Sequence, residues 1–455
     1  MIVSFSVSNF RSFLSEETFS LVASSRLSGG HEEHTTPIPD CQEQVLRTAI
    51  IYGANGAGKS NLFKALRYFK ALALGSTNKN NETGRIPFRF QEVISTPSTF
   101  ELHFITNNKL YQFGVKVTDN QILEEWLIQK VGNREKIIYE RISSEDGKVT
   151  VKAPGLKSAG EKIKALVTVG GPKHQTFLAT VNVTLDEPSR GKELSHVINW
   201  FNRSLILIGP DDFYASLGHL LATDNNFKKF AGEFLKYSST GVDHLKVNKK
   251  EITEDNLRTL LPESLVSRVL KDITKDENGQ AVVRLSNGNE LFVERTDQNH
   301  YYSITIHAAH ELQSGKFMPL ELSNESDGTR RLLNLIPALH RLRTTNTVYF
   351  IDEIDRSMHP ILVRKFLEFF LKSCEVGQRQ IIVTTHESNL LDLDLVRRDE
   401  IWFAEKDHNA ATKLYSLVDF KVRKDLEIRK HYLQGRFGAI PFLGNLDQLL
   451  TENVR

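Results

Sequence analysis

The sequence predicts an α/β fold with an antiparallel β subdomain and a mostly helical insertion, and three observations support this prediction. Short apolar runs at residues 49–52, 347–351 and 380–385 have the length and composition of buried strands. Residues 88–151 alternate apolar and polar side chains in segments separated by turns, which is typical of an antiparallel sheet. Apolar residues at helical spacing follow from about residue 193.

These patterns divide the 455 residues into three regions. Residues 1–154 form the N-terminal part of an α/β core together with the β subdomain, and residues 319–455 form its C-terminal part. Residues 155–318 form the insertion, which we expect to contact a partner or another copy of the chain.

The N-terminal region begins with two predicted strands, residues 2–7 and 17–22, which flank a turn. Residues 24–44 are rich in Ser, Gly, His, Thr and Pro and predict a loop. After the strand at 49–52, a helix is predicted by the spacing of Leu62, Phe63, Leu66, Phe69 and Leu72.

The other two regions contain both element types. In the insertion, short strands are predicted near residues 281–293 and 301–307. In the C-terminal region, an amphipathic helix at 361–371 separates two of the apolar runs, and further strands are predicted at 401–404 and 412–418.

The composition is that of an average globular protein, with 40% hydrophobic and 25% charged residues. No apolar run approaches the roughly 18–20 residues that span a bilayer, so we expect no membrane association. The N-terminus lacks the pattern of a signal peptide, and Cys41 and Cys374 cannot build a disulfide framework or a zinc site alone, so we expect a cytoplasmic protein. A net charge of +2 does not indicate a nucleic-acid binder and leaves DNA binding open.

A phosphate-binding loop occupies residues 53–60, with the sequence Gly53-Ala-Asn55-Gly56-Ala-Gly58-Lys59-Ser60. A predicted strand precedes it and a predicted helix follows it, as this motif requires. The glycines let backbone N–H groups converge on phosphate oxygens, and the helix N-terminus adds its positive dipole end. We expect ATP to bind here, with Lys59 on the β- and γ-phosphates, Ser60 on Mg²⁺, and Asn55 and Asn61 among the contacts.

Two acids end the apolar run at 347–351. Asp352 would lie at the carboxyl edge of the sheet, where it can hold Mg²⁺ through water, and Glu353 could polarise the attacking water as a general base. Adjacent strand residues point to opposite faces, so the two carboxylates could serve different partners. His386 follows the run at 380–385, where its imidazole could hydrogen bond to the γ-phosphate.

The order of these motifs resembles the heads of ABC-class ATPases such as Rad50 and SMC. More narrowly, residues 326–332, 352–360 and 432–441 resemble bacterial AAA-family ATPases with an ABC-like head, which are often encoded in anti-phage systems. Their members include the ATPase subunits of phage anti-restriction-induced systems, which are similar in length and layout. The resemblance covers roughly residues 1–150 and 315–443.

The resemblance assigns further roles. Arg11 and Ser12 of the turn Asn9-Phe10-Arg11-Ser12 would approach the nucleotide beside the phosphate loop. Ser326, Gly328 and Thr329 would form the ABC signature, which in such ATPases reaches the γ-phosphate of a partner subunit.

Three positions depart from the family pattern or are hard to align with it. Glu325 stands where the signature usually has leucine. His359 stands where the loop after the acids usually has aspartate. Gln91 is a candidate for the family's Mg²⁺-sensing glutamine.

The function that this resemblance implies is a regulatory ATPase of a bacterial anti-phage defence system. It would form a dimer or a higher homo-oligomer with ATP and control a separate toxin or nuclease effector, often of the Toprim type, with a phage protein as one candidate trigger. The alternative is a DNA-repair ATPase like Rad50 or RecF that acts directly on DNA. A transporter ATPase subunit ranks last, because a large insertion separates Lys59 from Ser326.

Overall fold

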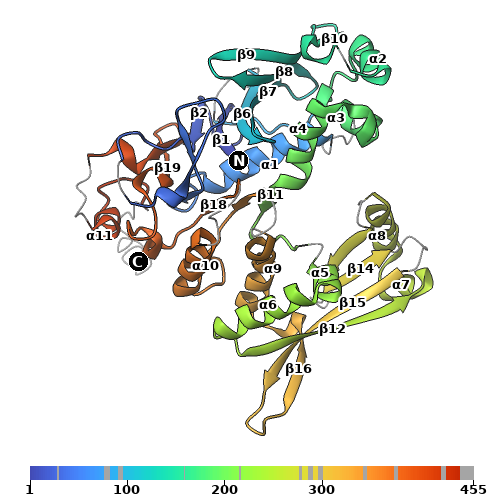
Figure 1. Cartoon of the computed structure of the whole chain (residues 1–455), viewed down its shortest axis with the longest axis vertical. Helices are drawn as coiled ribbons and strands as arrows, with labels where there is room; N and C mark the ends of the chain where they lie inside the picture. The colour runs from blue at the N-terminus through green and yellow to red at the C-terminus, as the bar shows by residue number, and fades with distance from the viewer. Residues whose placement is uncertain are drawn as a thin grey trace, which may run out of the picture. The chain divides into compact units, whose positions relative to one another are not determined.

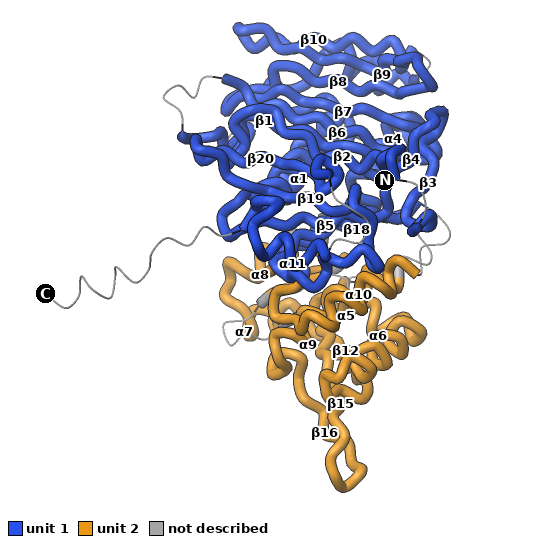
Figure 2. The backbone as a smooth tube through the Cα atoms, turned by 90° about the vertical axis from the view of Figure 1, so that its left-hand side faces the viewer, with its two compact units in different colours: residues 1–209, 345–354, 374–455 blue, residues 210–344, 355–373 orange. Residues whose placement is uncertain are grey.

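The computed structural model forms two compact units, which are described separately (Figure 2). Unit 1 contains residues 1–209, 345–354 and 374–455, and unit 2 contains residues 210–344 and 355–373. The structure describes residues 1–27, 30–75, 82–90, 96–157, 159–214, 217–275, 279–284, 290–295, 301–341, 346–372, 378–421 and 427–440.

Unit 1 contains a seven-stranded antiparallel sheet, which confirms the predicted β subdomain. Both N-terminal strands join it, because β1 pairs with β6 as well as with β2. In sheet order the strands are β10 (Val149–Lys152), β9 (Arg134–Ser143), β8 (Ile122–Val131), β7 (Lys109–Val117), β6 (Ser98–Thr106), β1 (Ile2–Ser8) and β2 (Glu17–Ser20).

A second, six-stranded sheet in unit 1 is parallel except for its last strand. In order its strands are β11 (Leu205–Ile208), β17 (Val348–Ile351), β18 (Gln380–Thr384), β5 (Thr48–Tyr52), β19 (Ile401–Lys406) and β20 (Thr412–Ser416). Because β18 lies between β17 and β5, the carboxyl ends of all three strands meet at one edge of the sheet. The predicted α/β fold is confirmed.

Helix α1 (Lys59–Leu74) contacts both sheets of unit 1 (Figure 1). The ring of Phe69 packs on Phe100 and Phe113 of the antiparallel sheet, with centroids 5.9 and 5.2 Å away. One and a half turns earlier, Phe63 packs edge-on against Phe350 of β17 at 5.4 Å. These contacts fix the helix whose first residues are Lys59 and Ser60.

The remaining elements of unit 1 are short. Its other α-helices are α2 (Glu161–Val169), α3 (Phe177–Thr184), α4 (Lys192–Asn199) and α11 (Ile428–Leu433). The segment predicted as a loop at 24–44 is mostly irregular, but it contains the 3₁₀ turn η1 (Glu32–His34) and the strand β3 (Thr35–Pro37), which pairs with β4 (Gln44–Leu46).

Unit 2 combines helices with a five-stranded antiparallel sheet. Its strands are β12 (Val242–Ile252), β13 (Gln280–Arg284), β14 (Glu290–Arg295), β15 (Tyr301–Glu311) and β16 (Phe317–Glu321). Its helices are α5 (Leu217–Thr223), α6 (Asn225–Tyr237), α7 (Glu254–Leu260), α8 (Glu263–Lys275), α9 (Asp327–Arg341) and α10 (Pro360–Lys372). Helix α6 carries the predicted apolar spacing and packs on β12 (Figure 1).

The division into units differs from the predicted regions. Residues 155–209 belong to unit 1, and residues 319–344 and 355–373 belong to unit 2. The inserted region also contains both helices and strands, whereas it was predicted to be mostly helical. The prediction missed β12, because the lysines of this strand were interpreted as a cluster of surface charge. None of the helices among the described residues has the length and apolar character needed to cross a bilayer.

Candidate functional site

The phosphate loop joins the end of β5 to the start of α1, and two of its glycines are required by close approach. Gly58 has φ +114°, and a Cβ there would lie 2.0 Å from the Oγ1 of Thr412. A Cβ at Gly53 would lie 2.4 Å from the carbonyl oxygen of Ala404. Both contacts come from the β19–β20 hairpin, so this hairpin sets the shape of the loop.

Lys59 is buried beneath the loop that precedes it. Its Nζ donates to the carbonyl oxygens of Gly53 at 2.7 Å and Ala54 at 3.2 Å. Asn55 and Gly56, at the crest of the loop, are exposed. The ammonium group is therefore held inside the curl of the loop while the crest faces solvent.

The Asp352 carboxylate, directly after β17, bonds to the start of helix α1 and to the end of β18. Its Oδ1 accepts hydrogen bonds from the hydroxyls of Ser60, at 3.2 Å, and Thr384, at 2.6 Å. Asp352 itself is only 1% exposed. A hydroxyl beside a carboxylate provides the oxygen ligands that Mg²⁺ prefers, so Ser60 and Asp352 fit the predicted Mg²⁺ site.

Glu353 lies in a turn rather than in a strand. Strand β17 ends at Ile351, and Glu353 has a left-handed backbone with φ +49°. Its N–H donates to the Oγ1 of Thr384 at 2.8 Å, which holds this unfavourable conformation. The expectation that strand alternation separates the two carboxylates was wrong, because the strand stops before both of them.

Thr384 is a site residue that sequence reasoning missed. Its hydroxyl donates to Asp352 and accepts from the Glu353 backbone, so one side chain orients both acids. Its main-chain carbonyl also accepts from the N–H of Ile354 at 3.1 Å. A threonine ending an apolar run carries no distinctive signal, and only the position of β18 beside β17 reveals its role.

Ser12 and Asn61 lie next to each other beside the phosphate loop. The Nδ2 of Asn61 donates to the Ser12 Oγ at 2.9 Å. Thr412, a second missed residue, lies 2.8 Å from both the Ser12 Oγ and the Ala57 carbonyl oxygen. The hydroxyl of Thr412 therefore ties the N-terminal turn to the phosphate loop.

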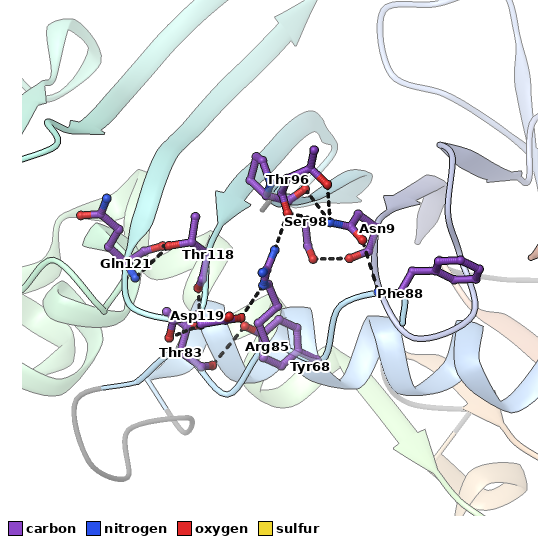
Figure 3. A network of polar contacts seen from close by, with 11 residues as sticks. Asn9, Tyr68, Thr83, Arg85, Phe88, Thr96, Ser98, Thr118, Asp119 and Gln121 are labelled. Atoms are coloured by element: carbon purple, nitrogen blue, oxygen red, sulfur yellow. Dashed lines mark hydrogen bonds and ion pairs between the residues drawn. The ribbon is translucent and has the colours of Figure 1, made fainter. Parts of the chain in front are cut away.

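The turn that carries Arg11 is fixed by the Asn9 network (Figure 3). The Asn9 Nδ2 donates to the Thr96 carbonyl at 2.6 Å, and its Oδ1 accepts from the Phe88 N–H at 3.2 Å. Arg85 donates to the same Thr96 carbonyl at 2.7 Å and pairs with an acid, Asp119. The network anchors the turn to β6 and to the segment that follows α1.

Arg11 is held in a left-handed conformation within that turn, with φ +51°. Its N–H donates to the Ile86 carbonyl at 2.8 Å. Burial lowers the pKa of its guanidinium, and its Nε has no hydrogen-bond partner within the described part of the chain. An orphaned buried donor of this kind suits an anionic ligand.

His386 lies two residues beyond β18 at the same sheet edge and is exposed. Gln91, the candidate for the Mg²⁺-sensing glutamine, lies outside the described residues. Of the C-terminal motif at 432–441, Tyr432 packs against Tyr52, the last residue of β5, with ring centroids 5.8 Å apart. Pro441 also lies outside the described residues.

The signature residues belong to unit 2, at the start of α9. The Ser326 Oγ accepts from the Thr329 N–H at 3.1 Å and so caps the helix, and Ser326 is exposed. A Cβ on Gly328 would lie 2.5 Å from the Ser357 carbonyl oxygen. Glu325, the departure from leucine, is buried and bonds to the Nε2 of His310 at 2.5 Å.

His359, in the loop after Asp352 and Glu353, is the second departure from the family pattern. Its carbonyl and its Nδ1 accept N–H groups from the first turn of α10, so the imidazole serves as a helix cap. Aspartate, the usual residue, is also a good cap, which explains how histidine is accommodated here.

Comparison with known families matches residues 49–157 and 195–392 to a family described as "AAA domain, putative AbiEii toxin, Type IV TA system". These segments make up more than half of the chain. The chain belongs to this AAA-domain family. The matched segments of the AAA domain include the phosphate loop, the signature, both acids and His386, whereas Ser12 and Thr412 lie outside them.

Among solved structures, two SMC heads are similar over most of the chain. One is the SMC head bound to the C-winged helix domain of ScpA, with 13% identity and a TM-score of 0.37 over 91% of this chain and 97% of that one. The other is the SMC head domain from Thermotoga maritima, with 12% identity and a TM-score of 0.37 over 91% and 98%. A search of curated proteins finds no match.

Proposed function

We propose that the chain binds ATP with Mg²⁺ and hydrolyses it as an ABC-class ATPase, at sites shared between two copies. The observation that carries this proposal is the Asp352 carboxylate, which accepts hydrogen bonds from Ser60 of the phosphate loop and from Thr384 next to Glu353. Membership in an AAA-domain family supports nucleotide binding. The same network supports hydrolysis, because the Thr384 hydroxyl that bonds to Asp352 also accepts the N–H of Glu353, our candidate base.

In this proposal, each residue around the phosphate loop has its own role in ATP binding or hydrolysis. The phosphates would bind at the N-terminus of α1, where N–H groups and Lys59 supply positive charge. Ser60 and Asp352 would hold Mg²⁺, which neutralises charge on the phosphates. Glu353 would accept a proton from the attacking water, and His386 would donate a hydrogen bond to the γ-phosphate. Arg11 and Ser12 would approach the nucleotide beside the loop.

The second half of each site would come from the signature of another copy. Ser326 is exposed and caps α9, and Gly328 lies in the first turn of that helix without a side chain. A hydroxyl and N–H groups at a helix N-terminus are suited to a phosphate presented by a second molecule.

The biological role that we propose is regulation of a separate effector in bacterial anti-phage defence, in the cytoplasm. The family's description as a putative AbiEii toxin of a type IV toxin–antitoxin system supports a place in such a system. ATP-driven assembly would hold or release the effector, for which a Toprim-type nuclease is our candidate, and a phage protein would act as trigger.

Solution mass and co-purification test these proposals separately. With a slowly hydrolysed ATP analogue the purified chain should become at least dimeric, and with ADP it should not. A mass that is the same in both nucleotides would refute the shared site. Co-expression with the neighbouring gene should then recover a nuclease in complex with the chain, and failure to recover any complex would refute only the regulatory role.

A further inference from the structure

Three side chains in the segment that precedes β3, outside the phosphate loop, converge on one point. His31, Glu33 and His34 lie in and next to η1, and each offers a nitrogen or oxygen ligand atom within 4.8 Å of the others. His34 is buried, His31 is partly buried and Glu33 is 58% exposed. In the described part of the chain this is the one group of three such residues.

The far nitrogen of each imidazole is already bonded to the protein. The Nε2 of His31 lies 2.9 Å from the carbonyl oxygen of Leu393. Because a carbonyl can only accept, this nitrogen carries the hydrogen, and the lone pair is on Nδ1. The Nδ1 of His34 lies 2.9 Å from the buried carboxyl group of Glu400, and when Glu400 is ionised it accepts the Nδ1 hydrogen, which leaves the lone pair on Nε2. Histidines that bind metals are oriented by partners of this kind.

The two remaining nitrogens face the same carboxylate oxygen. The Oε1 of Glu33 lies 3.6 Å from the Nδ1 of His31 and 3.7 Å from the Nε2 of His34. These distances are too long for hydrogen bonds. Ligands bound at about 2.0–2.1 Å in a tetrahedral zinc site lie roughly 3.4 Å apart, so the two distances from Glu33 match those between zinc ligands within a few tenths of an ångström.

We propose that His31, Glu33 and His34 bind a divalent transition metal of the zinc class, with Leu393 and Glu400 orienting the two imidazoles. Two imidazoles and one carboxylate suit zinc and leave a fourth position open on the exposed Glu33 side. Both orienting residues lie in the segment that leads into β19, the neighbour of β5. A metal bound at residues 31–34 would therefore link this segment to the parallel sheet and stabilise the folded chain.

Metal titration of the full chain tests this proposal without reference to ATP. After chelator treatment, Zn²⁺ should bind with one ion per chain in a competition assay, and Co²⁺ should give the intense visible absorption of a tetrahedral site. Zn²⁺ should also raise the melting temperature. His31→Ala, at a partly exposed position, should weaken Zn²⁺ binding at least about 100-fold, and Glu400→Gln should weaken it about 10- to 100-fold.

His103→Ala is the matched control. His103 also pairs with a carboxylate, Glu101 at 3.1 Å, but it belongs to no group of three ligands among the described residues. This variant should bind Zn²⁺ like the unaltered chain. Equal affinity of the unaltered chain, His31→Ala and His103→Ala, or a Co²⁺ spectrum like that of the ion in water, would overturn the proposal.

Discussion

The phosphate loop in unit 1 and the signature in unit 2 are built differently. Around the loop, three of the polar side chains are buried and hydrogen bonded within the chain: Ser12 and Lys59 are each 5% exposed and Asp352 is 1% exposed. In the signature, Ser326 is exposed and its hydroxyl caps its own helix. The first region is already organised within one chain, whereas the second presents an exposed serine that is available to another molecule.

This comparison predicts that changes at the loop affect ATP binding or hydrolysis within one chain, whereas changes at the signature spare binding. The largest effect is expected for Lys59→Ala. It should weaken ATP binding about 100-fold and remove measurable turnover, because a charged hydrogen bond is worth about 1.5–3 kcal/mol. Fluorescent-nucleotide titration checks this, with Lys64→Ala, exposed on the same helix, as the control. Equal ATP affinity in both variants would contradict the loop's role.

The next effect is expected for Glu353→Gln. The amide keeps the side chain's shape but cannot accept the proton, so turnover should fall by about 10²–10⁴. ATP binding should persist, and the chain should stay in its ATP-dependent assembly. Steady-state turnover and solution mass measured on one sample test both points. Normal turnover would show that another group activates the water.

A smaller effect is expected for Thr384→Val, which tests whether the Thr384 hydroxyl positions Asp352 and Glu353. The change removes the two hydrogen bonds that the hydroxyl makes to Asp352 and to the Glu353 N–H. Turnover should fall about 10- to 100-fold through misplacement of the acids. Unfolding free energy should fall by about 1–3 kcal/mol.

Thr385→Val provides the control for this change, because the Thr385 hydroxyl accepts the N–H of Glu387 instead of bonding to Asp352 or Glu353. It should cost less turnover than Thr384→Val. Steady-state kinetics and chemical denaturation of the two variants test this prediction. Equal losses of turnover in both variants would show that Thr384 has no specific role in the site.

The two elements that flank the phosphate loop could be predicted from the sequence, because the patterns that indicate them lie within short segments of the chain. The run at 49–52 and the helical spacing from Leu62 to Leu72 correspond to β5 and α1. In unit 2 the helix α6 was predicted, but β12 was not, since its lysine-rich stretch shows no alternation of buried and exposed positions. A strand of this kind is recognised only by its pairing with β15.

Some residues of the candidate site could be predicted from the sequence, and others could not. Motif residues such as Lys59, Ser60 and Asp352 could be named because their types and spacing are distinctive. Thr384 and Thr412 could not, because each acts on residues far away in the chain and the sheet order alone brings them together. The left-handed turn at Glu353 was also beyond prediction, because the acids that end the apolar run do not reveal the backbone conformation of the residues after it.

The central claim is that each ATP site combines the phosphate loop of one copy with the signature of another. Mixing two inactive variants, Lys59→Ala and Ser326→Arg, tests this claim most directly. Ser326→Arg should bind ATP normally but not hydrolyse it. In a two-fold dimer, random mixing should restore up to about a quarter of normal turnover, because half of the dimers contain one intact site. A mixture that stays inactive while mixed dimers form, or a Ser326→Arg chain with normal turnover, would contradict the account.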